Sequence, residues 1–379
     1  MKNVVIFGST GSIGRATLDV IEFHSERFRV LGLAAHTQKD LLIKQIQKFG
    51  PRYVIFTSHN EKLPEIKGTV YLYKQEGLEF LATHPETDIV VMGIPGLAGL
   101  VSTLKALDTG KTIALATKEI VVCAGHLLGG KKGRILPVDS EHNAIFQIID
   151  REKSSVSGIV LTASGGPFLN YNGDLSRVTV KQVLNHPVWK MGRRITVDSA
   201  TLMNKGFELI EAFYLFGISK ENISVVLHPQ AIVHGFVKFS DGFVKAVLSI
   251  PDMRYSINYC LNYPERIYAG LPELDIQQMG TLTFQRVEPG MFQCFDLAME
   301  ALKLGGSYLT VLNAADEEAV RLFLEGQINF KDIPALIELA MEKHKPVSLE
   351  NSDDILTLDK QVKKQVMAFF KRRYNLKIN

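Results

Sequence analysis

The sequence predicts an α/β protein whose first third folds as a doubly wound parallel sheet and whose last third is helical. Short apolar runs alternate with helical patterns from residue 3 to residue 139, which is typical of strand–helix–strand units. The first run, at residues 4–7, leads directly into a glycine-rich loop and a helix. The last third shows helical periodicity at residues 294–304, 312–320, 333–343 and 358–373.

Composition narrows the class of protein. The 379 residues suffice for two or three domains, and 46% hydrophobic with 22% charged residues is ordinary for a soluble globular chain. A net charge of +3 is too small to indicate a nucleic-acid or membrane partner. The three cysteines are scattered, no leader precedes the first strand, and the apolar stretch at residues 89–101 is broken by glycine and proline. We therefore expect a cytoplasmic protein.

A glycine-rich loop, residues 8–14, follows the first predicted strand. The spacing of Gly8, Gly11 and Gly14 allows a tight turn and lets the N–H groups at a helix start approach a pyrophosphate. Because the loop lies between a strand and a helix at residues 15–23, we favour a dinucleotide-binding site over a plain tight turn.

The turn after the second predicted strand, residues 28–34, bears on the choice of cofactor. A site for NAD usually has an acidic residue there to bind the ribose 2′-hydroxyl, and none occurs between Ala35 and Lys39. His36, Thr37 and Gln38, together with Lys39, would instead meet a 2′-phosphate, which favours NADPH. The alternative is an ordinary loop with relaxed cofactor specificity.

Two carboxylates follow the apolar run at residues 135–138. We expect Asp139 and Glu141 to lie in extended chain, where residues i and i+2 face the same side, at the carboxyl end of a strand. A helix at residues 143–149 would follow, capped by Asp139 or Ser140. The alternative is a capping aspartate beside a solvated glutamate. Lys118, at the end of another strand, would touch substrate or cofactor, or else be a surface cation.

A second group of polar residues lies in the middle of the chain. The glycine turn at residues 162–168 exposes N–H groups and the Ser164 hydroxyl, which suit an anion or form only a turn. Residues 195–199 are predicted to form a strand, and residues 200–216 a helix. Asn204, Lys205 and Glu208 share one face near the start of that helix. The start of the helix, with Ser199, Asn204 and Lys205, suits a phosphate.

Glu208 supplies a third carboxylate to the two that follow residue 138. Asp139, Glu141 and Glu208 would make an all-oxygen site, which suits Mg²⁺ or Mn²⁺ and not Zn²⁺. His228 and His234 flank a predicted strand and are interpreted as structural.

Residues 186–194, called the lid segment below, contain Trp189, the only tryptophan of the chain. Val188, Trp189 and Met191 are apolar, and Pro187 and Gly192 bracket them as hinge positions. We predict a mobile lid over a polar ligand. The alternative is a surface loop whose tryptophan packs down.

The last third carries no predicted chemistry. Residues 271–290, rich in proline and glycine, indicate a linker or an edge strand. Asn313 is the predicted cap of the helix at residues 312–320, and the basic end of the chain, Lys363 to Lys377, is predicted to be a solvated helix face.

Seven motifs together resemble the 1-deoxy-D-xylulose 5-phosphate reductoisomerase family, in the expected order and over nearly the whole chain. They are the stretches at residues 8–14, 137–147, 164–168, 186–192, 197–206, 251–254 and 312–315. Where many members have Ala-Asn-Lys-Glu-Ser, this chain has Ala116-Thr117-Lys118-Glu119-Ile120, and where many have Gly-Lys-Asn it has His36-Thr37-Gln38.

The resemblance implies an architecture and an activity. The regions would be a Rossmann-like doubly wound NADPH-binding domain at residues 1–139, an α+β connective catalytic domain at 140–270, a linker at 271–296 and a C-terminal helical bundle at 297–379. The family forms homodimers. It isomerises 1-deoxy-D-xylulose 5-phosphate and reduces the product with NADPH to 2-C-methyl-D-erythritol 4-phosphate, on the methylerythritol phosphate route to isoprenoids. The metal would be Mg²⁺ or Mn²⁺, with Co²⁺ as a further option.

By motif position the resemblance also assigns roles to residues. Asp139, Glu141 and Glu208 would hold the metal, and Lys118, Glu141 and His186 would be catalytic. The residues binding the cofactor would be Thr10, Gly11, Ser12, Ile13, His36, Thr37, Gln38, Thr117, Glu119 and Gly192. The residues binding the substrate would be Lys118, Ser140, Glu141, Ser164, His186, Trp189, Ser199, Asn204, Lys205 and Glu208.

Two other functions fit parts of the pattern. An NADP-dependent semialdehyde dehydrogenase would bind the same cofactor but would work without the three carboxylates and the metal. A nucleotide-sensing dimer would bind NADPH and tolerate loss of Glu208.

Overall fold

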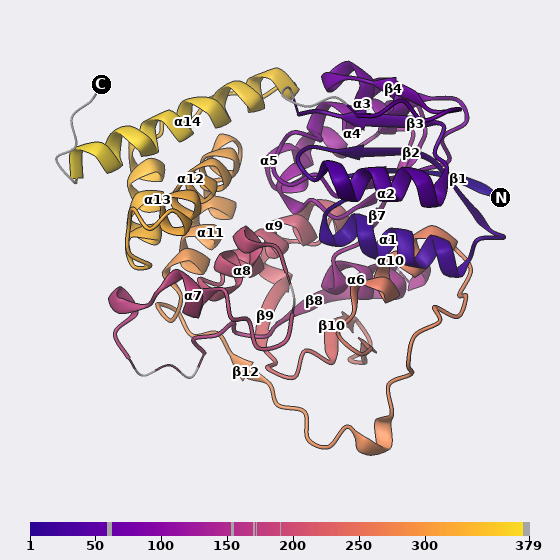
Figure 1. Cartoon of the computed structure of the whole chain (residues 1–379). Coiled ribbons are helices and arrows are strands. Elements are labelled where there is room, and N and C mark those ends of the chain that lie inside the picture. The colour runs from indigo at the N-terminus through magenta and orange to yellow at the C-terminus, as the bar shows by residue number, and fades with distance from the viewer. Residues whose placement is uncertain (59–62, 153–154, 170, 172, 190, 374–379) are drawn as a thin grey trace. The chain divides into compact units, whose positions relative to one another are not determined.

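A computed structural model describes residues 1–58, 63–152, 155–169, 171, 173–189 and 191–373 of the chain (Figure 1). The chain forms two compact units. The first unit comprises Met1–Ile120, Leu128–Arg151 and Asp252–Leu274, and the second comprises Val121–Leu127, Glu152–Pro251 and Asp275–Asn379. Among the described residues, no helix has both the length and the apolar surface that crossing a membrane requires.

The first unit contains a seven-stranded parallel sheet with the strand order β4-β3-β2-β1-β5-β6-β7. The chain starts in the middle of the sheet, builds outward to β4 and then returns to the other side of β1. This reversal between β1 and β5 creates the switch point at which doubly wound sheets bind ligands. The strands are β1 (Lys2–Phe7), β2 (Phe28–Ala35), β3 (Tyr53–Phe56), β4 (Val70–Leu72), β5 (Ile89–Met92), β6 (Thr112–Leu115) and β7 (Arg134–Pro137).

The strands of this sheet are short and almost wholly apolar because helices cover them. Val4, Ile6 and Val91 are fully buried, as expected for parallel strands that are covered on both faces. The helix after β1 turns Leu18 and Ile21 toward the same core. The helices are α1 (Ser12–Phe23), α2 (Lys39–Phe49), α3 (Lys74–Thr83), α4 (Leu100–Asp108), α6 (Ser140–Glu152) and α10 (Met253–Asn262). Helix α5 (Lys118–Leu128) begins in this unit, and its residues Val121–Leu127 belong to the second unit. The predicted doubly wound domain is confirmed.

The second unit combines a mixed five-stranded sheet, ordered β11-β10-β8-β9-β12, with helices. Only β8 and β9 pair in parallel, while β10, β11 and β12 pair antiparallel with their neighbours. The predicted linker or edge strand at residues 271–290 contains β12 at the edge of this sheet. The strands are β8 (Val156–Ala163), β9 (Ile223–Leu227), β10 (Val233–Phe239), β11 (Val244–Leu248) and β12 (Gln285–Arg286).

Helices complete the second unit, and α12 lies at the centre of the helical region. It packs against α11, α13 and α14, and Figure 1 shows α14 in yellow running beside the shorter helices. The predicted α+β region and the helical bundle are confirmed. The helices are α7 (Val180–Val183), α8 (Arg193–Ala200), α9 (Met203–Phe216), α11 (Gln293–Leu304), α12 (Ser307–Leu324), α13 (Asp332–Lys343) and α14 (Ser352–Arg373). Short 3₁₀ turns occur at Leu175–Arg177, Lys220–Asn222 and Ile276–Gln278.

The predicted strand at residues 195–199 is wrong, because these residues belong to the helix α8. The β-branched run Ile195-Thr196-Val197 favours a strand locally, but α8 buries Thr196, Val197 and Ala200 within the unit, and burial overrides so weak a preference. The Thr196 hydroxyl also donates to the Gly192 carbonyl oxygen, at 2.8 Å. Leu202, with φ of 60°, then breaks the helix before α9.

The predicted cap at Asn313 is also wrong. Asn313 lies within α12, fully buried, where its side chain accepts a hydrogen bond from Arg194 at 3.1 Å. Asparagine usually favours helix ends because its side chain competes for backbone groups. Here a partner 119 residues away in sequence satisfies the amide oxygen instead.

Candidate active site

The glycine-rich loop connects β1 to α1 through close backbone packing. Gly8 has φ of +85°, and a Cβ atom there would lie 2.6 Å from the Gly93 carbonyl oxygen. A Cβ atom on Gly14 would lie 2.3 Å from the Gly8 carbonyl oxygen. Both positions therefore require glycine. The helix begins at Ser12, and its N-cap residue, Gly11, has no side chain that could accept a hydrogen bond. The backbone N–H groups of the first turn are therefore suited to bind an anion.

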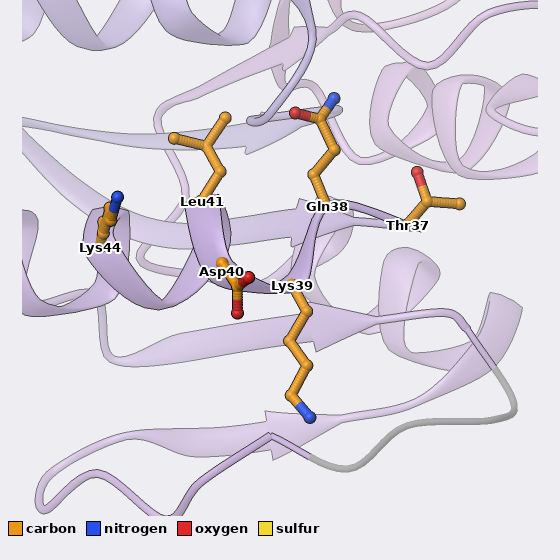
Figure 2. A pocket seen from close by; sticks show the side chains of 6 residues that line it. All are labelled: Thr37, Gln38, Lys39, Asp40, Leu41 and Lys44. Atoms are coloured by element: carbon orange, nitrogen blue, oxygen red, sulfur yellow. The ribbon is translucent and has the colours of Figure 1, made fainter.

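The turn after β2 borders a pocket of about 460 Å³, shown in Figure 2. In that view the Gln38 and Leu41 side chains project to one side of the start of α2, and the Lys39 and Asp40 side chains to the other. Gln38 Nε2 donates to the Thr10 carbonyl oxygen at 3.4 Å, which ties this turn to the glycine-rich loop. The residues lining the pocket are Thr37, Gln38, Lys39, Asp40, Leu41 and Lys44.

His36 differs from its neighbours in this turn. Its Nδ1 lies 2.8 Å from Thr57 Oγ1 at the end of β3, and it is not one of the residues that line the pocket. Two lysines and one aspartate border the pocket, so cations outnumber anions, as a phosphate requires. The role predicted for Thr37 and Gln38 stays a prediction, as does that of His36.

Lys118 and Asp139 meet at the ends of two neighbouring strands. Leu115 of β6 pairs with Pro137 of β7, so the residues just beyond both strands emerge at the same edge of the sheet. There Lys118 Nζ lies 2.6 Å from Asp139 Oδ2, and the lysine side chain is only 6% exposed. This is not a solvated surface cation. The Thr117 hydroxyl donates to the Ile94 carbonyl oxygen at 2.7 Å and ties the turn to the segment after β5.

Glu141 is not in extended chain, which corrects the geometric argument from residues i and i+2. Helix α6 begins at Ser140, so Glu141 lies in its first turn. The Asn143 N–H donates to the Asp139 carbonyl oxygen at 2.8 Å, which starts the helix one turn earlier than expected. The two carboxylates therefore lie at the junction of a strand and a helix, and the Ser140 hydroxyl donates to the Glu141 carboxylate.

The Asp139 carboxyl is held in its anionic form. Burial alone would raise its pKa, but the Lys118 ammonium and the nearby His142 ring hold the pKa well below its usual range. His142 is fully buried, with Nδ1 3.7 Å from Asp139 Oδ1. Sequence reasoning assigned no role to His142, although its place three residues after Asp139 in a helix was a signal.

In the second unit, His186 joins two serines from different elements. Its Nε2 lies 3.2 Å from Ser164 Oγ, just after β8, and 3.1 Å from Ser199 Oγ, near the end of α8. Its Nδ1 accepts the backbone N–H groups of Val188 at 3.2 Å and Trp189 at 2.9 Å. A nitrogen that accepts carries no proton, so the ring is the neutral Nε2–H tautomer. Burial lowers the pKa of His186 and favours this neutral form.

The start of α9 confirms the predicted shared face of Asn204, Lys205 and Glu208. Asn204 Nδ2 donates to Glu208 Oε1 at 2.6 Å, and the Lys205 ammonium forms an ion pair with the Glu208 carboxylate. Lys205 and Glu208 are 3% and 1% exposed, so this is a desolvated charge pair at the beginning of a helix. Such a pair is a polar site that an incoming phosphate or cation can reorganise.

The lid segment is described except for residue 190, which lies outside the described residues. Trp189 and Met191 are half-buried, and the Trp189 ring centroid lies 6.4 Å from that of His234. The Gly192 carbonyl oxygen accepts the Thr196 N–H at 3.1 Å and so begins α8. His234 Nε2 meets Ser249 Oγ at 2.8 Å, in accordance with a structural role.

Three family models match the chain. A model described as 1-deoxy-D-xylulose 5-phosphate reductoisomerase matches residues 4–125, and a model of that enzyme's C-terminal domain matches residues 135–216. A third, described as DXP reductoisomerase C-terminal domain, matches residues 248–365.

Individual proteins match over nearly the full length. A 1-deoxy-D-xylulose 5-phosphate reductoisomerase of Caldanaerobacter subterraneus subsp. tengcongensis is 46% identical, over 98% of this chain and 100% of the relative. The enzyme of the same name from Bacillus cereus is 44% identical, over 97% and 99%.

Solved structures agree. A crystal structure of DOX-P reductoisomerase in complex with NADPH, fosmidomycin and magnesium matches with a TM-score of 0.92 and 36% identity, covering 98% of each chain. The 1-deoxy-D-xylulose 5-phosphate reductoisomerase of Zymomonas mobilis in complex with NADPH matches with a TM-score of 0.89 and 34% identity, covering 98% of this chain and 99% of that one.

Proposed function

Since the chain belongs to the 1-deoxy-D-xylulose 5-phosphate reductoisomerase family, we propose that it is an NADPH- and divalent-metal-dependent oxidoreductase of isoprenoid biosynthesis. It isomerises 1-deoxy-D-xylulose 5-phosphate and reduces the rearranged aldehyde to 2-C-methyl-D-erythritol 4-phosphate. One observation within the first unit carries this proposal beyond family membership. The buried Lys118–Asp139 pair lies at the same edge of the parallel sheet as the glycine-rich loop. The side chains that would bind a polar substrate and the loop that would bind a dinucleotide thus lie at the same edge of the sheet.

The first unit binds NADPH. Thr10, Gly11, Ser12 and Ile13 surround the start of α1, where backbone N–H groups favour the pyrophosphate. The turn at residues 36–38, beside Lys39 and Lys44, binds the 2′-phosphate. Thr117, Glu119 and Gly192 are the further residues that we propose to bind the cofactor. NADPH supplies the hydride, while the protein positions and shields the transfer.

Asp139, Glu141 and Glu208 hold the divalent cation. Their donor atoms are all carboxylate oxygens, which fits Mg²⁺ and Mn²⁺, with Co²⁺ as a further option. The anionic state of Asp139 beside Lys118 supports this fit, because a ligand must be deprotonated. When bound, such a cation polarises a carbonyl group as a Lewis acid. Lys118 and Glu141 lie beside the reacting carbons and move or hold protons there.

The second unit binds the sugar phosphate. The Ser164 and Ser199 hydroxyls, the Asn204 amide and the Lys205 ammonium bind the phosphate and hydroxyl groups. His186 lines the substrate, and Trp189 and Met191 cover it. Ser140, a residue of the first unit, is also proposed to line the substrate. Because the phosphate is remote from the reacting carbons, its binding energy orients them for the reaction.

The protein acts as a homodimer, and β11 is the surface that supports this proposal. It lies at one edge of the five-stranded sheet and pairs with β10 along its other side. Val244 is 54% exposed, and Phe243, just before the strand, is 73% exposed. An exposed apolar edge strand is a surface that pairs with a second copy. We also place the enzyme in the cytoplasm, on the basis of its three scattered cysteines.

The test is an assay of NADPH oxidation with purified protein and 1-deoxy-D-xylulose 5-phosphate. We expect turnover that requires Mg²⁺ or Mn²⁺ and stops in excess chelator. Turnover of a semialdehyde that survives chelation would identify a simple dehydrogenase instead. NADPH binding without any turnover would identify a nucleotide sensor.

A further inference from the structure

Arg194, the second residue of α8, is bound by the helical region of the second unit. Its guanidinium lies 3.2 Å from Glu317 Oε2, 3.1 Å from Asn313 Oδ1 and 3.5 Å from Asp316 Oδ2, all on α12. Its Nε also lies 3.7 Å from Asp198 Oδ2, one turn further along α8. The Arg194 side chain is 20% exposed, whereas Asp316 and Asn313 are fully buried. The planar Arg194 guanidinium thus links α8 to α12.

The crosslink continues to the last helix of the chain. Glu317 uses its other oxygen, Oε1, to bind Lys363 of α14 at 3.1 Å, and Lys363 also binds Asp359 at 2.9 Å. The Lys363 side chain is only 26% exposed, so the prediction that it lies on a solvated helix face is wrong for this residue. Residues 374–377 of the same prediction lie outside the described residues. Its neighbours Glu317 and Asp359 raise its pKa against the effect of burial, which keeps it charged. Arg194, Glu317 and Lys363 form a continuous chain of charges, called the arginine relay below.

The arginine relay starts where the lid segment ends. Upstream, His186 holds the first residues of the lid segment to Ser164 and Ser199. Downstream, Arg194 holds the first turn of α8 to α12. The residues between these two points are therefore tethered at both ends. Ser199 lies on the same short helix as Arg194, so the helix that α12 fixes also carries one of the proposed phosphate ligands.

We propose that Arg194 is a positioning residue for the reductoisomerase reaction. It does not touch the substrate. Through Glu317 and Lys363, the C-terminal helices hold the start of α8, which fixes Ser199 and the downstream hinge of the lid segment. The helical region thereby controls how well the substrate is positioned, although it supplies no catalytic group. This inference rests on the proposed function only where it is tested by enzyme kinetics.

The chain offers a matched control for Arg194. Arg321 is another arginine of the helical region that binds carboxylates, those of Glu318 at 2.7 Å and Glu325 at 2.6 Å. Arg321 and Glu318 are on α12 and Glu325 directly follows it, so Arg321 reaches neither α8 nor the lid segment through these bonds. Arg321→Gln removes the same charge as Arg194→Gln without cutting the arginine relay.

The experiment compares Arg194→Gln, Arg194→Lys, Lys363→Met and Arg321→Gln in the full-length protein. We expect Arg194→Gln to lower kcat/KM for the sugar phosphate by about 100-fold, the scale of a misplacement of about 1 Å. The Kd for NADPH should change much less than kcat/KM, because Gly192 is the one proposed cofactor residue beside Arg194 and the other proposed cofactor residues belong to the first unit. Arg194→Lys keeps the positive charge but lacks the planar guanidinium, so its kcat/KM should lie between those of Arg194→Gln and the unmodified protein. Arg321→Gln should match the unmodified protein.

A second measurement works without activity. Trp189 is the only tryptophan, so quenching of its emission by acrylamide reports on the lid segment alone. We expect faster quenching in Arg194→Gln and Lys363→Met than in Arg321→Gln. If Arg194→Gln does not fold, Arg194→Lys and Lys363→Met carry the test. Equal quenching and equal kcat/KM in all variants would overturn the inference. An unmodified protein without activity would instead count against the proposed function, and the quenching comparison would still decide the role of Arg194.

Discussion

The backbone N–H of Trp189 donates to Nδ1 of His186, at 2.9 Å. The opposite nitrogen of the same ring meets Ser164 and Ser199 at 3.2 and 3.1 Å. One imidazole therefore holds the lid segment with one nitrogen and the two proposed phosphate serines with the other. This arrangement requires a neutral ring, since protonation of Nδ1 would place an N–H against two backbone N–H groups.

The lid segment should loosen in acid. Burial lowers the pKa of His186 below the ordinary value, so the proton binds more readily when the lid segment is open than when it is closed. The stabilisation of the closed turn is therefore complete above about pH 6.5 and is lost as the pH falls below that value through the lowered pKa. We expect acrylamide quenching of Trp189 to rise in this range.

His186→Gln is the control for this pH dependence. Glutamine offers one acceptor and one donor but does not titrate, so quenching in the variant should be independent of pH over the same range. The same rise in both proteins would assign the pH dependence to another group.

Glu208→Gln should impair the metal site without changing the size of the side chain. A loosely held cation no longer fixes the substrate carbonyl, so kcat should fall by about 100-fold or more. Raising the Mg²⁺ concentration should recover part of the loss. Full turnover of Glu208→Gln at limiting Mg²⁺ would remove Glu208 from the ligand set.

NADPH should be preferred over NADH, measured as kcat/KM for each cofactor. Lys39 and Lys44 border the pocket beside Thr37 and favour a phosphate. Thr37→Asp adds a carboxylate to the same turn. At about 4 Å from a phosphate, that charge costs about 1–4 kcal/mol, so the preference should fall about tenfold or more. An unchanged ratio in Thr37→Asp would place the 2′-phosphate elsewhere.

Trp189 should cover the bound substrate. We expect its emission to change when the substrate or a phosphonate analogue joins the NADPH complex. Trp189→Ala should cost about 2–4 kcal/mol in transition-state stabilisation, on the scale of lost aromatic packing. Trp189→Phe keeps most of the apolar surface and should lose less. Constant emission, together with near-normal kcat/KM in Trp189→Ala, would leave this segment an ordinary loop.

Local sequence patterns predicted those parts of the molecule that local physics determines. Buried parallel strands show as apolar runs, and the cluster of Asn204, Lys205 and Glu208 follows from helical spacing. The strand predicted at residues 195–199 is wrong because the strand propensity of β-branched residues is weak. Burial of one face of α8 stabilises the helix more strongly.

Distant contacts could not be predicted in this way. Arg194 meets Glu317 across 123 positions of sequence, and Glu317 then meets Lys363. Nothing near Arg194 except Asp198, four residues on, indicates an ion pair. Likewise, α6 starts at Ser140 because the Asn143 N–H donates to the Asp139 carbonyl oxygen. The sequence of these residues is equally consistent with an extended conformation.

The central claim is that this chain rearranges a carbon skeleton before reducing it, and proton NMR of the reaction product tests it most directly. Reduction of 1-deoxy-D-xylulose 5-phosphate without rearrangement leaves the methyl group beside a CH–OH carbon, where it gives a doublet. Rearrangement followed by reduction places the methyl group on a carbon without hydrogen, where it gives a singlet. We predict a methyl singlet, formed only when NADPH and Mg²⁺ are both present. A methyl doublet would contradict the account and identify a simple ketone reductase.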